Sequence, residues 1–590
     1  MALNEIQKFR LNIVAVAVGV GFLGIIGRLY QIQCLQHRHY AELARKQHLT
    51  RIPIPVRRGT IFDSCGNALA ICLPVDSLYA DPANVKERNQ AAWRLAPVLG
   101  MEPLDVFSEL IRPKRFIWLK RKLQPELRPQ IERLKIKGIG FTREFRRGYP
   151  QGTLLGQTLG FVGIDNNGIE GLELTLEPYL SGEEGFHVAQ RDLAGTLITL
   201  PELKRDPGTN GLDVTLTIDC NVQRIAEEEL KKTADEWRPK SIASVVMNPQ
   251  TGDILALANW PPFNPGTVEN LTREEKAELE RLSHNSAIID SYEPGSTFKP
   301  FTVCGALEDG TVTPDTLFDC EDGTAVLHGR RLRDTHGHGV QPVSQIIIRS
   351  SNIGMAKIGL KVGKTDLYRW VRAFGFGVPA GLPLKGESPG LLNPPHKWSK
   401  YHSITSIPMG QEISVTAVQL ATAYSAIANG GNLMKPRLIR KVVSPDTGEV
   451  VAESGPEVVR RVISETTARR MAEMLVGVVQ GEHGTGRRAQ VPGYLIAGKT
   501  GTAQKALENA RGYSSTDYVS SFVGFAPAYD ARVCVLVKVD TPHGYSHYGG
   551  TVAAPAVREI LRRTLAYLAV PPTAPGRLAS TGADAGTSTD

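Results

Sequence analysis

The sequence predicts a mixed α/β (α+β) fold, in which an antiparallel sheet is built from distant segments and a helical insertion separates them. Three observations predict it. Strand-forming segments begin near residue 213 and recur between residues 494 and 540. Helix-forming segments accompany the strands at both places, and a long helix-rich stretch lies between the two groups. We therefore expect both groups to share one sheet within a single domain.

The first group begins with a strand at 213–218, where apolar residues alternate, followed by a helix at 221–237. A hairpin follows, with its turn at Gln250-Thr251-Gly252. The second group consists of three strands and a closing amphipathic helix, at 494–505, 517–528, 532–540 and 555–570.

Length and composition limit the broad class of the protein. A chain of 590 residues exceeds what one hydrophobic core usually serves, so two to four domains are expected. The 42% hydrophobic and 22% charged residues are typical of a folded protein. The net charge of +8 suits nucleic acid, anionic lipid or an anionic polymer. Because no run of Lys and Arg reaches the length of a nucleic-acid patch, we expect no nucleic-acid partner.

An apolar run near the N-terminus predicts a transmembrane anchor at 11–30. Residues 11–27 are uncharged and mostly apolar. A helix of 17 to 20 residues spans about 25–30 Å, enough for the hydrocarbon core of a bilayer. A cleaved signal peptide is the alternative, but a small-residue cleavage site is missing after the run. We expect the anchor to be retained.

The orientation of this anchor does not follow from charge. Two basic residues precede the run and four follow it, so the positive-inside count does not favour a cytoplasmic N-terminus. They are Lys8 and Arg10 before the run, and Arg28, Arg38, Arg45 and Lys46 after it. Long domains translocate largely regardless of charge. We place 1–10 in the cytoplasm and the bulk of the chain outside it, because the chemistry below needs an extracellular substrate.

Two further domains and a tail are expected after the anchor. Residues 31–212 begin with a stretch rich in Arg, Pro and Gly and then form a helix-and-loop region to about residue 210. A turn cluster at 206–211 ends this domain. Residues 213–570 form the catalytic domain, and residues 571–590 lack core residues and form a disordered tail.

The cysteines are few and dispersed, which argues against a disulfide framework or a zinc site. A bridge between Cys65 and Cys72 is conceivable, but two unpaired, small buried residues fit better. The seven cysteines lie at positions 34, 65, 72, 220, 304, 320 and 534.

Four histidines could suggest a metal. His336 and His338 form an H-x-H pair, and His543 and His547 precede a Tyr-Gly-Gly sequence. Zinc would need further ligands. Because glycines flank these histidines, we expect loop residues near a cleft, and neither a metal nor another cofactor.

The first chemically informative motif is Ser296-Thr297-Phe298-Lys299. Ser296 follows a turn at 293–295 and opens a helical stretch, where N–H groups and the helix dipole stabilise negative charge. Lys299 lies three residues on, within reach of the serine hydroxyl. A desolvated lysine beside other cations can lose its proton near neutral pH and act as a base. Pro300 fits only the first helical turn. The alternative is an N-cap serine with a solvated lysine.

The second motif, Ser350-Ser351-Asn352, lies between apolar segments at an expected helix–helix junction. Polar groups in such a place are structural hydrogen-bonding groups or site residues. As site residues, Ser350 would relay a proton to a leaving nitrogen, and Asn352 would bind the substrate amide.

The third motif, Lys499-Thr500-Gly501-Thr502, interrupts a strand. A glycine inside a strand often marks close approach of a ligand backbone. Lys499 and the two threonine hydroxyls suit a substrate carboxylate, and the strand N–H groups suit an oxyanion. The alternative is a solvent-exposed edge strand.

Together the three motifs supply what acyl-serine chemistry on an amide needs, and local structure cannot explain their wide separation. The trio resembles that of the penicillin-binding proteins and serine β-lactamases. The blocks at 57–70 and 160–173 resemble the pedestal motifs of class B penicillin-binding proteins, although Ser64-Cys65 departs from the usual pattern. A class A enzyme is disfavoured because no glycosyltransferase-like stretch precedes these blocks. Longer class B-like blocks surround the motifs at 285–310, 350–360, 407–431, 491–505 and 548–555.

The resemblance implies a penicillin-binding transpeptidase fold with a pedestal (dimerisation-type) domain at 31–212. It also implies a serine-type D-Ala-D-Ala transpeptidase. Ser296, deprotonated by Lys299, would attack the penultimate D-Ala carbonyl, with the N–H groups of Ser296 and Thr502 holding the oxyanion. Ser350 and Lys499 would pass a proton to the departing D-Ala.

In the same scheme Thr500, Gly501 and Thr502 bind the substrate, and the two threonines hold the carboxylate of the leaving D-Ala. A second stem peptide then supplies the amine that takes the acyl group. The expected partners are peptidoglycan stem peptides and lipid-linked wall precursors, β-lactams, a polytopic membrane glycosyltransferase and other division proteins. The expected location is the inner membrane, with a single pass and the catalytic domain on the periplasmic side.

Within class B, Thr500 and the sequence at 503–505 look more like the septal, FtsI-type enzymes than the elongation type. An elongation-type transpeptidase is the first alternative. A membrane-anchored β-lactamase or β-lactam sensor is another, although it needs neither this length nor a pedestal. A non-catalytic division scaffold is the third alternative. The presence of all the catalytic residues argues against it.

Overall fold

The computed structural model describes residues 4–191, 197–198, 204–268, 273–507 and 512–573. Most of the predicted tail at 571–590 therefore lies outside the described residues. The chain forms two units, one of Met1–Arg57 with Gly182–Asn210 and one of Arg58–Ser181 with Gly211–Asp590. The predicted domain boundary at 212/213 stays a prediction.

The first unit begins with the long helix α1 (Glu5–Tyr30), which contains the apolar run predicted at 11–30. The Asn4 side chain caps its N-terminus. With the π-helical turn that follows, α1 is long and apolar enough to cross a membrane, and none of its side chains is buried. The helix α2 (His37–His48) follows, and four strands form a small sheet around β6 (Glu183–Arg191). The strands that pair with β6 are β1 (Leu49–Ile54), β7 (Leu197–Ile198) and β8 (Arg205–Thr209).

The pedestal part of the second unit is built on a seven-stranded sheet. Its longest pair, β3 and β5, is antiparallel over ten residues. The strands are β2 (Ile61–Phe62), β3 (Ala68–Ala80), β4 (Ile117–Lys120), β5 (Ile139–Gly148), β9 (Asp213–Leu216), β17 (Ile439–Val443) and β18 (Val450–Glu453). The associated helices are α3 (Arg88–Leu99), α4 (Pro103–Leu110), α5 (Leu127–Arg133), α6 (Gly156–Leu159), α7 (Gly171–Thr175) and α8 (Glu177–Leu180).

The prediction of a helix-and-loop region to about residue 210 is therefore wrong. Two long strands, β3 and β5, run through it. Pro74 interrupts the apolar pattern of β3, and the arginines at 143, 146 and 147 interrupt that of β5. Because these side chains hide the two-residue period, alternation alone does not identify the strands.

A buried ion-pair network joins the two pedestal motif blocks. Arg58, in the first block, donates to Glu173 in the second, with Nε 2.7 Å from Oε2. Arg147 donates to the other oxygen of Glu173 at 2.6 Å, and Arg58 also pairs with Glu177 at 2.7 Å. Arg58 is 2% exposed and Glu173 is fully buried. Such groups are retained inside a protein only when they are paired.

The catalytic part contains the predicted antiparallel sheet, with strand order β11-β10-β22-β21-β20. The expectation that the strand at 213–218 joins this sheet is wrong, because β9 pairs with β2 and β17 in the seven-stranded sheet instead. The central strands of the catalytic sheet are buried on both faces. As predicted, β10 and β11 form a hairpin, and the other three strands come from the far end of the chain. The strands are β10 (Ser241–Met247), β11 (Ile254–Trp260), β20 (Ala497–Ala506), β21 (Tyr513–Ala526) and β22 (Val533–Asp540).

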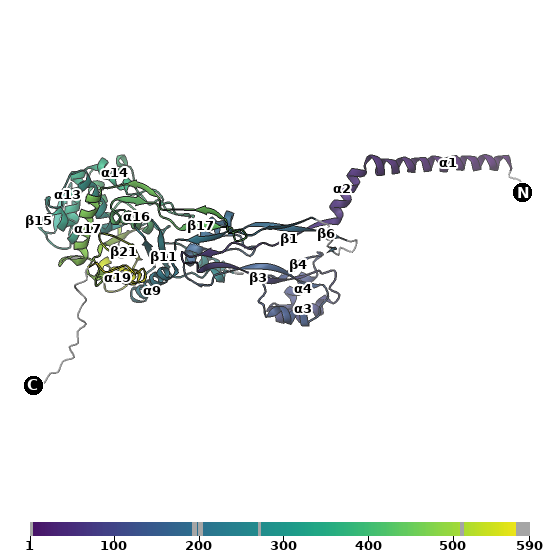
Figure 1. The fold of residues 1–590 in the computed structure, drawn as a ribbon, viewed down its shortest axis with the longest axis horizontal. Helices are drawn as coiled ribbons and strands as arrows, with labels where there is room; N and C mark the ends of the chain where they lie inside the picture. Colours follow the sequence, from purple (N-terminus) through teal and green to yellow (C-terminus); the bar gives the residue numbers. More distant parts are fainter. Residues whose placement is uncertain (1–3, 192–196, 199–203, 269–272, 508–511, 574–590) are drawn as a thin grey trace, which may run out of the picture. The chain divides into compact units, whose positions relative to one another are not determined.

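Helices cover both faces of this sheet. The helices predicted at 221–237 and 555–570 are α9 (Cys220–Trp237) and α19 (Ala554–Tyr567), which pack together on one face (Figure 1). The helical insertion forms the larger core on the other face. Its helices are α10 (Arg273–Ser283), α11 (Lys299–Glu308), α12 (Val343–Arg349), α13 (Asn352–Val362), α14 (Lys364–Ala373), α15 (Ser403–Ser406), α16 (Ala417–Ala428) and α17 (Glu465–Gln480). The short helix α18 (Gly549–Val552) follows β22 and leads into α19.

Six short strands complete the insertion and its surroundings in three two-stranded ribbons, and β13 and β14 precede the second motif in the chain. They pair as β12 (Leu317–Asp319) with β15 (Val340–Pro342), β13 (Thr324–Leu327) with β14 (Arg330–Arg333), and β16 (Asn432–Met434) with β19 (Val458–Arg461). The cysteines are free, with Cys65 exposed and Cys72 buried.

Candidate active site

Ser296 lies in a short 3-10 turn, Gly295–Phe298, that runs directly into α11. The predicted helix N-terminus is therefore present, with Pro300 in its first turn. Gly295 has φ +54°, and a Cβ atom there would lie 2.9 Å from the carbonyl oxygen of Thr502. This close approach, which a side chain would obstruct, brings the serine turn against strand β20.

The three motifs meet at the hydroxyl of Ser350. Lys299 Nζ donates to the Ser350 carbonyl at 2.5 Å, to Asn352 Oδ1 at 2.8 Å and to Ser350 Oγ at 3.1 Å. Lys499 Nζ donates to the same Oγ at 2.9 Å. Ser350 therefore lies between two lysine side chains that come from distant parts of the sequence.

Both lysines are fully buried, and burial makes their charged forms unfavourable. Burial lowers the pKa of Lys299 to about 7, although the Asp334 carboxylate opposes the shift. Burial and the neighbouring charge of Lys299 lower the pKa of Lys499 well below its usual range. Near neutral pH, a lysine of this site can therefore accept a proton.

The second motif occupies the junction predicted for it, between α12 and α13. Ser350 ends α12 in the left-handed conformation, with φ +63°, which is uncommon outside glycine. Ser351 caps α13 by accepting a hydrogen bond from the Gly354 N–H at 2.9 Å. This junction fixes the directions of the Ser350 and Asn352 side chains.

Asp334 holds the same junction from outside the motif. One of its oxygens accepts from Ser351 Oγ at 2.5 Å, and the other accepts from the Asn352 and Ile353 N–H groups. Asp334 is not among the site residues predicted from the sequence. Asp334 stands immediately before the histidine-rich loop at 335–338, and only the histidines of that loop drew attention.

Strand β20 presents the third motif at the edge of the sheet. Lys499 is fully buried, which excludes a solvent-exposed strand. The Thr500 hydroxyl lies 3.1 Å from that of Thr485, and Thr502 Oγ1 accepts from the Gly549 N–H at 3.1 Å. A Cβ atom on Gly501 would lie 2.4 Å from Ser521 Oγ, so close packing requires glycine there.

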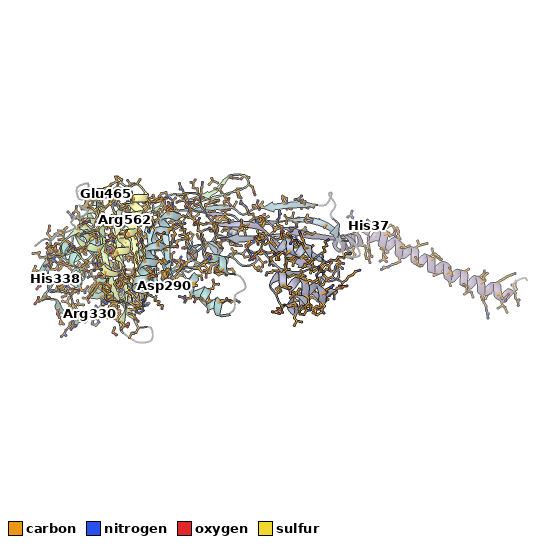
Figure 2. The ribbon with its side chains drawn as sticks, turned by 90° about the horizontal axis from the view of Figure 1, so that it is seen from below. His37, Asp290, Arg330, His338, Glu465 and Arg562 are labelled. Carbon is orange, nitrogen blue, oxygen red and sulfur yellow. The ribbon has the colours of Figure 1, made fainter. Side chains whose placement is uncertain are left out.

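The four histidines considered as possible metal ligands lie in loops. His547 stacks on Tyr518 with ring centroids 3.9 Å apart, and Tyr548 packs against the same imidazole at 4.7 Å. His338, labelled in Figure 2, lies in the loop between β14 and β15. Within the described part of the chain, no three His, Cys, Asp or Glu side chains are grouped to hold a metal ion.

Two family models match the chain. One describes the penicillin-binding protein transpeptidase domain and matches residues 242–562. The other describes the penicillin-binding protein dimerisation domain and matches residues 53–216. The chain is a class B penicillin-binding protein. The resemblance, the mixed fold and the enzyme class predicted from sequence, a serine-type D-Ala-D-Ala transpeptidase, are therefore confirmed.

Relatives extend over nearly the whole of this penicillin-binding protein. It is 33% identical over 571 residues to the probable peptidoglycan D,D-transpeptidase PenA of Neisseria meningitidis, covering 96% of this chain and 94% of PenA. It is 30% identical over 575 residues to the peptidoglycan D,D-transpeptidase FtsI of Escherichia coli, covering 96% and 93%. Penicillin-binding protein 3 of Mycobacterium tuberculosis, solved with ampicillin, superposes with a TM-score of 0.69 at 27% identity, covering 89% and 98%.

Proposed function

We propose that this penicillin-binding protein cross-links peptidoglycan stem peptides through an acyl-enzyme on Ser296. The observation that carries the proposal is the hydroxyl of Ser350, which receives hydrogen bonds from both Lys299 and Lys499. The names of PenA and FtsI, both peptidoglycan D,D-transpeptidases, support the same substrate.

In the first step, Ser296 attacks the penultimate D-Ala carbonyl while Lys299 takes its proton. Lys299 suits this role because its pKa is lowered to about 7, so a large fraction of the amine is neutral at physiological pH. The N–H groups of Ser296 and Thr502 then hold the oxyanion, which the close approach of the serine turn to β20 supports.

The proton then moves to the leaving D-Ala. Ser350 can pass it on because its hydroxyl accepts hydrogen bonds from both Lys299 and Lys499. Thr500 and Thr502 hold that carboxylate, and Gly501 lets the peptide approach the strand. Asn352 orients the substrate amide.

A stem-peptide amine then attacks the acyl-serine, which forms the cross-link and frees Ser296. A β-lactam would open on the same serine and remain attached. Complexes of the Mycobacterium tuberculosis relative with ampicillin and aztreonam support this expectation. A β-lactamase would need rapid deacylation instead.

We further propose that α1 anchors the chain in the membrane with the catalytic part on the periplasmic side, where wall peptides lie. Its length and apolar surface support the anchor. The expected domains, 31–212 as pedestal and 213–570 as catalytic domain, belong to the same proposal. The likeness of Thr500 and 503–505 to septal enzymes supports a role in division, alongside a polytopic glycosyltransferase. Midcell rather than side-wall localisation of a fluorescent fusion would support this role.

Labelled penicillin tests the transpeptidase proposal. The purified full chain in detergent should form an adduct that lasts for many minutes, and Ser296→Ala should form none. An adduct lost within seconds would favour a β-lactamase. Unchanged growth with Ser296→Ala as the sole copy would favour a scaffold.

A further inference from the structure

A cavity of about 890 Å³ adjoins the catalytic serine turn. One side is lined by Tyr292 and Glu293, which come just before that turn, and another by Ala503 and Gln504, which come just after the third motif. The catalytic chemistry described above uses none of these side chains. The cavity therefore begins where the third motif ends, along the last residues of β20.

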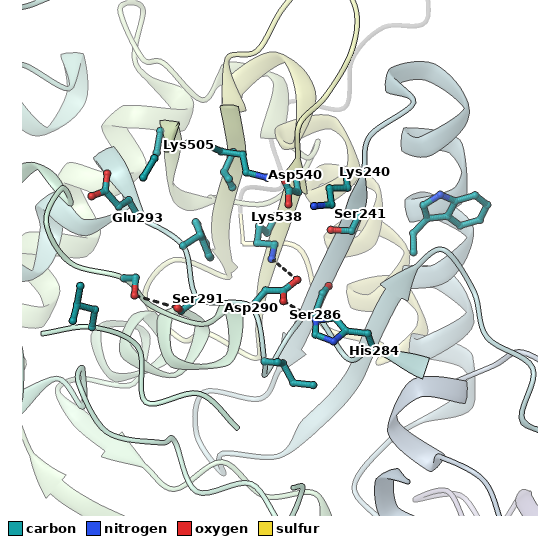
Figure 3. A pocket seen from close by; sticks show the side chains of 18 of the residues that line it. Lys240, Ser241, His284, Ser286, Asp290, Ser291, Glu293, Lys505, Lys538 and Asp540 are labelled. Atoms are coloured by element: carbon teal, nitrogen blue, oxygen red, sulfur yellow. Dashed lines mark hydrogen bonds and ion pairs between the residues drawn. The ribbon is translucent and has the colours of Figure 1, made fainter. Parts of the chain in front are cut away.

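Lys538 of β22 lines this cavity and is 2% exposed. Figure 3 shows it near the middle of the pocket, facing Asp290. Its Nζ is 3.9 Å from Asp290 Oδ2, which is too far for a hydrogen bond, while Asp290 Oδ1 is 2.6 Å from His284 Nε2. The Tyr292 ring lies 5.4 Å from Nζ. No hydrogen-bond acceptor within the described ranges reaches this buried amine.

Buried ammonium groups normally have charge-assisted hydrogen bonds, because losing water without them is costly. Burial lowers the pKa of Lys538, and the carboxylates of Asp290 and Asp540 oppose this shift only in part. Among the described residues, Lys538 therefore has a carboxylate only at 3.9 Å, and it lines a cavity from which a carboxylate ligand could approach its amine more closely.

The other cations of the cavity have less to offer. Lys505 is paired with Asp540 at 2.7 Å, and Arg281 is paired with Glu278 at 2.6 Å. The labelled side chains of Lys505 and Asp540 are neighbours in Figure 3. Lys240 is exposed and can be hydrated. Lys538 is thus the buried cation of this cavity that still lacks a close partner among the described residues.

The edge position of β20 determines which part of a substrate would reach this cavity. An extended peptide can add to a sheet edge as a further strand. We take the substrate peptide to run antiparallel to β20, with its C-terminal carboxylate at Thr500 and Thr502. The residues before its C-terminus then lie beside Ala503 and Gln504. At roughly 3.4 Å per residue, the residue two before the C-terminus lies about 7 Å back along the strand. That residue would reach the mouth of the cavity.

We propose that this cavity binds the side chain of the stem residue two positions before the terminal D-Ala, and that Lys538 binds a free carboxylate on that side chain. The preferred side chain carries a free carboxylate, rather than the corresponding carboxamide. The inference rests on the proposed function for the direction in which the peptide lies.

Two peptides ending in D-Ala-D-Ala, identical except for a carboxylate or a carboxamide on that side chain, test the inference. Binding is measured by calorimetry on the full chain in detergent, in the Ser296→Ala background, where turnover does not interfere. The carboxylate peptide should bind on the order of tenfold to a hundredfold more tightly, as expected for a charged hydrogen bond. Lys538→Met should abolish this preference, whereas the control Lys505→Met should retain it.

Equal binding of the two peptides, or a preference that survives in a folded Lys538→Met variant, would overturn the inference. If Lys538→Met does not fold, the comparison of the two peptides alone still decides, because a purely structural lysine gives no preference. A carboxylate preference in a chain whose Ser296 never forms a peptidyl-enzyme would support this site and contradict the proposed function.

Discussion

The rate at which penicillin acylates Ser296 should depend on pH through Lys299. Its pKa falls from 10.5 to about 7 because the amine is buried. This shift corresponds to about 5 kcal/mol of preference for the neutral form. Since the neutral amine is the base, the rate should rise with pH and level off above neutrality.

The expected magnitude follows from the neutral fraction of Lys299. With a pKa of about 7, about 3% of the amine is neutral at pH 5.5 and about 97% at pH 8.5, an increase of about 30-fold. A lysine with its ordinary pKa would instead give an increase of about 1000-fold over the same range, with no plateau. Stopped-flow acylation under second-order conditions measures this profile, and circular dichroism at each pH confirms that the chain stays folded.

Two results would refute this reasoning. A rate that still rises tenfold per pH unit above pH 8 would show that Lys299 keeps an ordinary pKa. A rate already constant below pH 6 would contradict Lys299 as the base, because its pKa is lowered only to about 7.

Two substitutions test the groups that hold the site and the pedestal. Asp334→Asn weakens the bonds to Ser351 and Asn352, so penicillin acylation should slow by about tenfold to a hundredfold; the same rate as the control Asp322→Asn would contradict the positioning role. Arg58→Met leaves Glu173 buried with one cation fewer, so urea denaturation should show a loss of about 3–5 kcal/mol. A loss as small as that of Arg128→Met, whose ion pairs are exposed, would contradict the importance of the network.

Much of the catalytic fold could be predicted from sequence because its signals are local. The hairpin at β10 and β11 and the strands β21 and β22 have strong apolar patterns, and the helices beside them have clear amphipathic periods. The expectation that the early hairpin and the late strands of the chain share one sheet is confirmed by the pairing of β10 with β22. The pedestal strands β3 and β5 could not be recognised because proline and arginine interrupt their alternation.

The motif residues could be found in sequence, but their supporting contacts could not. Nothing local connects Asp334 with the Ser351 hydroxyl, since the turn between α12 and α13 creates that contact. Lys538 appears in sequence as one polar residue in an apolar strand, which is usual for a strand with one exposed face. Only the packing of Asp290 and Tyr292 over the sheet shows that it is buried.

The most direct test of the account is to capture the peptidyl-enzyme. The full chain in detergent is mixed with a D-Ala-D-Ala peptide, quenched with acid and analysed by mass spectrometry after digestion. The account predicts the mass of the peptide lacking its terminal D-Ala on Ser296, which disappears when an acceptor amine is added and a cross-linked product forms. An adduct on another residue, or cross-linking that persists in Ser296→Ala, would contradict it.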